Sequence, residues 1–101
     1  MTKTDLIELL ERKFAIQVVL AVKRMPGCSK ADVMGDNNRR TKFLRIDEMI
    51  KAGIITTDEE KRQHQIIKLY LSPKGQELAA ILDKLYEFSE SYPLPDIESE
   101  E

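Results

Sequence analysis

The first quarter of the chain carries large apolar residues at the spacing of one helical face. Five of them follow one another at intervals of four residues: Leu6, Leu10, Phe14, Val18 and Val22. Between Phe14 and Val22 only Gln17 is polar, and a helix that is apolar nearly all round is buried on several sides. The pattern therefore predicts a single central core helix, capped by Thr4 or Asp5.

Two shorter helices with a tight turn between them are predicted next. Met25-Pro26-Gly27 ends the first helix, and Ser29 can cap a second one that runs to about Met34. Gly35-Asp36-Asn37-Asn38 has the composition of a turn. A third helix is predicted from about 38 to 52, with Gly53 after its end. Its inward face is expected to hold Phe43, Ile46, Met49 and Ile50. Together these elements have the form of a helix-turn-helix.

The apolar pattern then changes from a helical to a strand period. Ile54–Thr57 and Gln65–Leu71 read as two strands joined by a polar turn at 58–63, which predicts a β-hairpin. Ser72 and Pro73 can begin a last helix. Its apolar stripe is Leu78, Ile81, Leu82, Leu85 and Phe88. The predicted fold is mainly α with a small β-hairpin (α+β), in the order α-α-α-β-β-α.

The composition is that of one globular domain, and the charged residues are unevenly distributed along the chain. Of the 101 residues, 42% are hydrophobic and 34% are charged. The net charge is −2, but residues 1–82 carry 15 basic against 11 acidic residues, a net of +4. Residues 83–101 carry seven acidic residues and one lysine. A basic body with an acidic end is compatible with a phosphate-binding surface on one face. We expect a domain at 1–90 and an acidic, disordered tail at 91–101.

Other features narrow the class of protein. No uninterrupted apolar stretch is longer than Val18–Val22, which is far shorter than the ~20 residues of a membrane span. The sequence shows no basic-then-apolar leader, and its only cysteine is Cys28. These observations predict a cytoplasmic protein without a membrane partner, an intrachain disulfide or a metal site. One His, one Cys and no phosphate-binding glycine loop also predict that it is not an enzyme and needs no cofactor.

Three local motifs resemble those of the prokaryotic winged helix-turn-helix regulators of the MarR, HxlR and PadR type. Ile46–Ile55 looks like the end of their recognition helix running into the wing, which has the pattern xLxxxGLI. Leu71-Ser72-Pro73-Lys74-Gly75 is similar to the LTPKG that follows the wing, and Gly27–Val33 resembles the entry to the second helix. The resemblance covers roughly residues 6–88 and implies a winged helix-turn-helix, usually a twofold dimer on DNA.

The hydrogen-bond donors of the third helix lie where this resemblance needs them. A recognition helix enters the major groove with its N-terminal half, and here that half and its entry turn are rich in donors. The predicted DNA-binding residues are Asn37, Asn38, Arg39, Arg40, Thr41, Lys42 and Arg45. Arginine can bridge guanine O6 and N7, and asparagine can pair with adenine. The simpler alternative is that these charged residues form an ordinary solvent-exposed helix face.

The wing and the single cysteine are weaker candidates. Lys61 and Arg62 could reach the minor groove or the flanking backbone, although acidic residues at 58–60 precede them. His64, the only histidine, is more simply an incidental surface residue. Cys28 precedes a helix start, which could lower its thiol pKa and permit redox sensing, but a half-buried neighbour of the cap is the simpler interpretation.

The last helix, at about 73–90, is expected to form the interface of a homodimer. The candidate interface residues are Leu78, Leu82, Leu85 and Phe88. The alternative is that this helix only folds back on the first. The sequence thus predicts a sequence-specific, homodimeric transcriptional regulator that binds double-stranded DNA, with a winged-helix subunit for protein–protein contact as the alternative. Operator, effector and the sign of regulation do not follow from the sequence.

Overall fold

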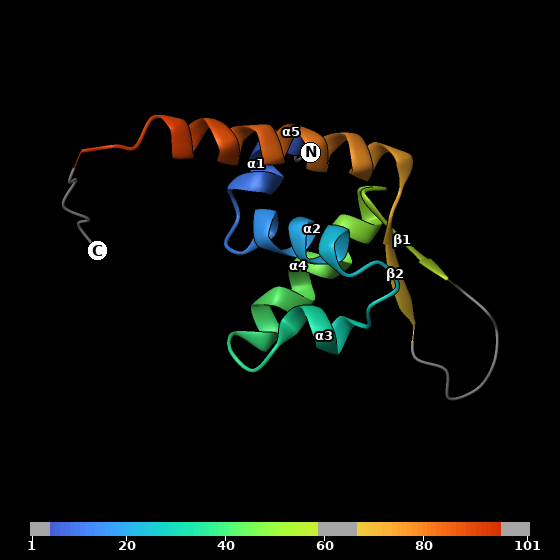
Figure 1. Ribbon diagram of the computed structural model, residues 1–101. Helices are drawn as coiled ribbons and strands as arrows, with labels where there is room; N and C mark the ends of the chain where they lie inside the picture. Colours follow the sequence, from blue (N-terminus) through green and yellow to red (C-terminus); the bar gives the residue numbers. More distant parts are fainter. Residues whose placement is uncertain (1–4, 59–66, 96–101) are drawn as a thin grey trace.

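The computed structural model describes residues 5–58 and 67–95 and confirms a mainly helical fold with one antiparallel two-stranded sheet (Figure 1). In chain order the elements are α1 (Leu6–Glu11), α2 (Ala15–Arg24), α3 (Lys30–Met34), α4 (Arg39–Lys51), β1 (Ile55–Asp58), β2 (Lys68–Leu71) and α5 (Pro73–Ser91). This is the predicted order, except that the first predicted helix consists of two.

The single long N-terminal helix predicted from the four-residue spacing is wrong. Asp5 caps α1 by accepting a 2.8 Å hydrogen bond from the Glu8 N–H, but α1 ends at Glu11 and Phe14 takes a left-handed conformation with φ 68°. In a continuous helix the Lys13 carbonyl would accept from the residue four positions on. Here it accepts from the Arg45 side chain at 2.9 Å instead. A contact between residues far apart in the sequence thus helps to form the break between α1 and α2, which no Gly or Pro marks.

The central position predicted for the Phe14–Val22 segment is confirmed. Val19 and Val22 are fully buried, and Ala15 and Val18 are 1% exposed. α2 contacts every other helix and β2. Its short branched side chains let those neighbours approach closely, so α2 is the element against which the remainder of the domain is assembled.

The wing pairs β1 with β2 in the register Ile55↔Leu71 to Asp58↔Lys68. Ile54, predicted as the first strand residue, precedes β1 and is fully buried. On the other side of β2, Cys28 forms an isolated antiparallel bridge with Leu69, whose N–H donates to the Cys28 carbonyl at 2.8 Å. The hairpin is therefore tied to the segment that enters α3. The predicted turn and Gln65–Ile66 lie outside the described residues, apart from Asp58.

Cys28 is buried behind this bridge. Burial raises the pKa of its thiol above the ordinary value of 9.0, and the nearby Asp32 carboxylate adds to the increase. The lowered pKa considered from the helix-start position is therefore wrong. The thiol is held in its protonated form, which is the poor nucleophile.

The Ser72–Gly75 motif joins α5 to the end of α4. The Ser72 hydroxyl accepts from the Gly75 N–H at 3.0 Å, which caps α5 as predicted, and donates to the Gly53 carbonyl at 2.6 Å. Lys74 donates to the Ala52 carbonyl at 3.1 Å. A Cβ built on Gly75 would lie 2.1 Å from the Ile54 carbonyl oxygen. Only glycine permits this approach of helix to backbone.

The single apolar stripe predicted for α5 divides into two faces. Leu78 and Leu82 are 8% and 4% exposed and belong to the core, so two of the predicted interface residues serve the fold of their own chain. A second stripe, at spacings of four, three and four residues, is at least 56% exposed: Ile81, Leu85, Phe88 and Tyr92. The C-terminal part of α5 extends past the other helices (Figure 1).

None of the helices within residues 5–58 and 67–95 is both long and apolar enough to cross a membrane. α5 ends at Ser91, and residues 96–101 of the predicted acidic tail lie outside the described residues.

Gly75→Ala is expected to destabilise the domain. Replacing glycine by alanine inside a helix ordinarily stabilises it by about 1 kcal/mol. Here the new methyl group collides with backbone, and overpacking costs about 1–3 kcal/mol. Urea unfolding should therefore show a lower free energy of unfolding. Glu77→Ala, an exposed position two residues on, is the control and should change it little; a stabilising Gly75→Ala would contradict the close approach.

We expect the Cys28 thiol to react slowly with an alkylating agent and to lower the free energy of unfolding at high pH. While the thiol is protonated in both the folded and the unfolded chain, its raised pKa does not make the free energy of unfolding depend on pH. As the pH rises, the unfolded chain releases the thiol proton first. The free energy of unfolding of the native protein should thus fall more steeply above pH 9.0 than that of Cys28→Ala. Iodoacetamide should alkylate the folded protein more slowly than the unfolded one. Equal alkylation rates would contradict a buried, protonated thiol.

Candidate DNA-binding surface

The α3–turn–α4 unit is built by local hydrogen bonds that the sequence predicts in part. The Ser29 hydroxyl accepts from the Asp32 N–H at 3.2 Å, and the Asp32 carboxylate accepts from the Ser29 N–H at 3.0 Å, which is a complete capping box. Gly35 then turns the chain with φ 61°, and Asn38, the residue before α4, takes the left-handed conformation with φ 55°. These two positive φ angles account for a turn between two helices at positions where Gly and Asn are favoured.

The buried face of α4 decides what the helix shows to solvent. Ile46 and Met49 are fully buried, as predicted. Phe43, which was expected to face inward with them, is 43% exposed, and Leu44 is 49% exposed. The Lys30 ammonium of α3 lies 4.8 Å from the centre of the Phe43 ring. The inward placement of Phe43 is therefore wrong, because its side chain lies at the surface beside Lys30 of α3.

The N-terminal end of α4 is exposed where the donors were predicted. Asn37, Asn38, Arg39 and Arg40 are all exposed. Asn38 makes no capping bond with its side chain. Arg39 donates to the Gly35 carbonyl at 3.1 Å, at the end of α3. Arg40 has no hydrogen bond or ion pair with any residue in the described ranges, so its guanidinium is available to a ligand.

Lys42, one of the seven predicted donors on α4 and its entry turn, makes its contacts within the protein itself. Lys42 donates to the Met34 carbonyl at 3.2 Å, and its ammonium lies 5.2 Å from the Phe14 ring. It and Thr41 are half-buried. Lys42 therefore joins α4 to the end of α3 and to the α1–α2 break, and in this conformation its charge does not point out from the surface.

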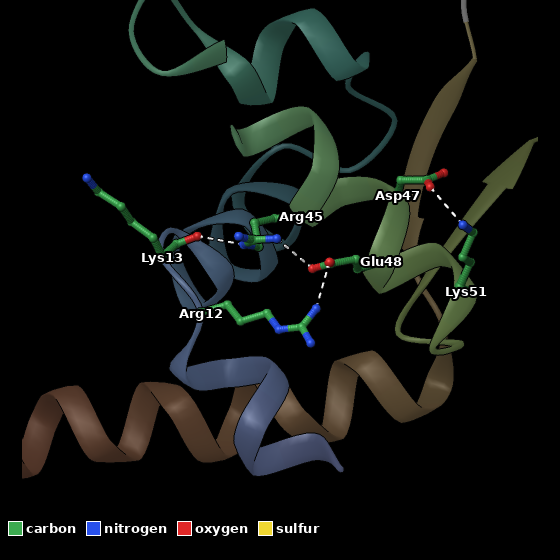
Figure 2. Close-up of polar contacts among 6 residues, drawn as sticks. All are labelled: Arg12, Lys13, Arg45, Asp47, Glu48 and Lys51. Atoms are coloured by element: carbon green, nitrogen blue, oxygen red, sulfur yellow. Dashed lines mark hydrogen bonds and ion pairs between the residues drawn. The ribbon is translucent and has the colours of Figure 1, made fainter. Parts of the chain in front are cut away.

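Arg45 is also turned inward, toward the break between α1 and α2 and not outward from α4. Its side chain is 16% exposed; it donates to the Lys13 carbonyl and pairs with Glu48 at 2.8 Å. Glu48 also accepts from Arg12 at 2.7 Å, so one carboxylate bridges two arginines (Figure 2). Sequence reasoning did not identify Glu48 as a partner of these arginines. The i, i+3 spacing to Arg45 was a visible signal, but Arg12, 36 residues away, was not.

Asp47, the other acid in the second half of α4, pairs with Lys51 at 3.2 Å (Figure 2). Both side chains are well exposed, so the pair is worth little for stability. Its consequence is electrostatic, because the lysine offsets an acidic charge that would otherwise oppose phosphates beside Arg40.

The wing contacts predicted for Lys61 and Arg62 fall outside the described residues, as does His64. Within the described ranges no group of three or more His, Cys, Asp or Glu side chains could hold a metal ion. The surface assembled from the described residues thus consists of the exposed entry turn and outer face of α4, which we call the α4 surface: Asn37, Asn38, Arg39, Arg40, Phe43, Leu44, Asp47 and Lys51.

Comparisons with solved structures identify the fold. No protein-family model matches the sequence, and no curated protein matches it. The transcriptional regulator SlyA is 20% identical over 88% of this chain and 63% of its own, with a TM-score of 0.68. FabT of Streptococcus pneumoniae, solved in complex with DNA, is 12% identical over 84% and 65%, with a TM-score of 0.66.

YodB from B. subtilis is 14% identical over 86% of this chain and 88% of its own, with a TM-score of 0.64. The chain spans less than two thirds of the length of SlyA and FabT. At these identities the likeness establishes the fold, and further neighbours are described as MarR proteins. The predicted resemblance is therefore confirmed in architecture: the chain has the winged helix-turn-helix fold of the MarR-family regulators.

Proposed function

We propose that this chain is a sequence-specific transcriptional regulator that binds double-stranded DNA as a homodimer. The observation that carries the proposal is the exposed N-terminal end of α4, where Asn38, Arg39 and Arg40 stand outside a helix whose opposite face is buried. A helix mounted this way can enter a major groove end first. The fold shared with SlyA and with FabT, solved on DNA, supports the same role.

Arg40 is the strongest candidate for a base contact. Its guanidinium has five donors and no partner among the described residues, and a bidentate contact to guanine O6 and N7 fits that geometry. Asn38 offers the amide that pairs with adenine. Arg39, tethered to the Gly35 carbonyl at 3.1 Å, is better placed to contact a phosphate beside the turn. Arg45 and Lys42 position α4 rather than touch DNA.

The dimer uses the outer stripe of α5 in this proposal. Ile81, Leu85, Phe88 and Tyr92 recur at the spacing of a helix–helix seam, and each is more than half exposed. Phe88 and Tyr92 already stack at 4.8 Å between ring centres. In Figure 1 α5 and α3 lie on opposite sides of α2. A second copy on α5 would therefore leave both α4 surfaces free for two half-sites.

A protein-binding subunit is the second candidate. It is favoured by the exposure of Phe43 and Leu44 at 43% and 49% on the face that would enter the groove. The cations at Arg39 and Arg40, and the neutralisation of Asp47 by Lys51, favour DNA. The neighbours are described as transcription regulators, which supports a role without catalysis.

Arg40→Ala should weaken binding to a duplex selected from a random DNA pool by about 1–3 kcal/mol, because a bidentate base contact is lost. Fluorescence anisotropy at several salt concentrations measures this. Lys84→Ala removes one cation from α5 and is the matched control, with little expected effect. If the native protein retained no duplex at low salt, the regulator would be excluded and the protein-binding subunit favoured.

Leu85→Lys should convert the dimer into a monomer, since the new charge would be buried against the second copy. The residue is 56% exposed within one chain, so the folded subunit should survive. Sedimentation equilibrium gives the mass, and Glu87→Lys, on another side of α5, is the control for added charge. A native protein that sediments as a monomer at all concentrations, or a Leu85→Lys variant that remains a dimer, would contradict this interface.

A further inference from the structure

The outer face of α4 combines charge and apolar surface in a particular order. Arg40, Leu44, Asp47 and Lys51 follow one another at three- and four-residue spacings, with Phe43 beside them. Ile46 and Met49 occupy the opposite side in the core. Any ligand that meets Arg40 along this face therefore also meets Leu44 and Phe43.

The apolar part of this face is only partly covered by the described residues. Phe43 is 43% exposed and Leu44 is 49% exposed, and within residues 5–58 and 67–95 the Phe43 ring stacks on no other aromatic ring. The Phe43 ring contacts the Lys30 ammonium, which lies 4.8 Å from the centre of the ring. This contact places a cation next to the ring and favours one ring position, so the apolar surface is partly organised before a ligand arrives.

The charges around the two apolar residues suit a polyanion at the edges and a neutral group at the centre. Arg39 and Arg40 lie at the N-terminal end, and Lys30 lies on the α3 side. Toward the C-terminal end, Lys51 pairs with Asp47 at 3.2 Å, and both Arg12 and Arg45 bind Glu48. Neither acid of α4 is left without a cationic partner.

In the major groove one base presents an apolar group. Thymine carries a 5-methyl group at its groove edge, and apolar side chains contact it in direct readout. We propose that Phe43 and Leu44 contact thymine methyl groups next to the base contacted by Arg40, so that these two side chains set part of the sequence preference. The inference rests on the proposed function and names the bases that the α4 surface selects.

The expected size of the effect follows from the burial of one methyl group. Such burial changes affinity by about fourfold. Replacing thymine by uracil removes the methyl group and keeps the Watson–Crick pair. The experiment uses a duplex selected by the native protein from a random DNA pool. The duplex is synthesised once with thymine and once with uracil at every thymine position.

The native protein should bind the uracil duplex about fourfold more weakly for each methyl group contacted. Leu44→Ala and Phe43→Ala should each bind the thymine duplex more weakly and should each lower the thymine-to-uracil ratio. Both positions are more than two-fifths exposed, so both variants should fold. Leu94→Ala, a 78% exposed leucine beyond α5, makes the same chemical change away from α4 and should leave the ratio unchanged.

The outcomes separate the two proposals. Equal binding of the two duplexes by the native protein would overturn the methyl contact and leave the DNA-binding regulator intact. A ratio that stays the same in Leu44→Ala and Phe43→Ala would also overturn it, because the preference would then come from the shape of the duplex. If neither duplex binds at low salt, the proposed function fails and the inference fails with it.

Discussion

The burial of Ile46 and Met49 in the core decides which side chains α4 can present. Both are fully buried, and α4 packs against α2 and α3. Since a helix turns once in 3.6 residues, fixing those two positions inward places Arg40 and Leu44 outward together. The proposed regulator depends on this constraint, because a rotation of α4 would bury its donors and expose its core.

A set of polar contacts on another side of α4 also holds the helix in this orientation. Glu48 binds Arg12 and Arg45, Arg45 also binds the Lys13 carbonyl, and Lys42 lies over the Phe14 ring. All of these contacts meet the short break between α1 and α2. The left-handed Phe14 is a conformation that bulky residues rarely adopt. Contacts from α4 accompany it here: Arg45 binds the Lys13 carbonyl, and the Lys42 ammonium lies 5.2 Å from the centre of the Phe14 ring.

The sequence predicted the fold well and the candidate site in part. The capping box at Ser29, the Ser72–Gly75 motif and the wing follow from local chemistry, which sequence displays directly. The break at Phe14 and the inward turn of Arg45 could not be predicted, because both depend on contacts between residues 32 positions apart. Periodicity also could not divide the α5 stripe, since Leu82 and Leu85 are equally apolar and only the packing of α5 on α2 separates them.

The central claim is that the α4 surface, and not another face, meets DNA. Amide chemical shifts of the isotope-labelled protein, recorded while a selected duplex is added, test it residue by residue. We expect the largest changes on residues 37–44 and small changes along the outer stripe of α5. Changes confined to α5, or the absence of any change at low salt, would contradict it.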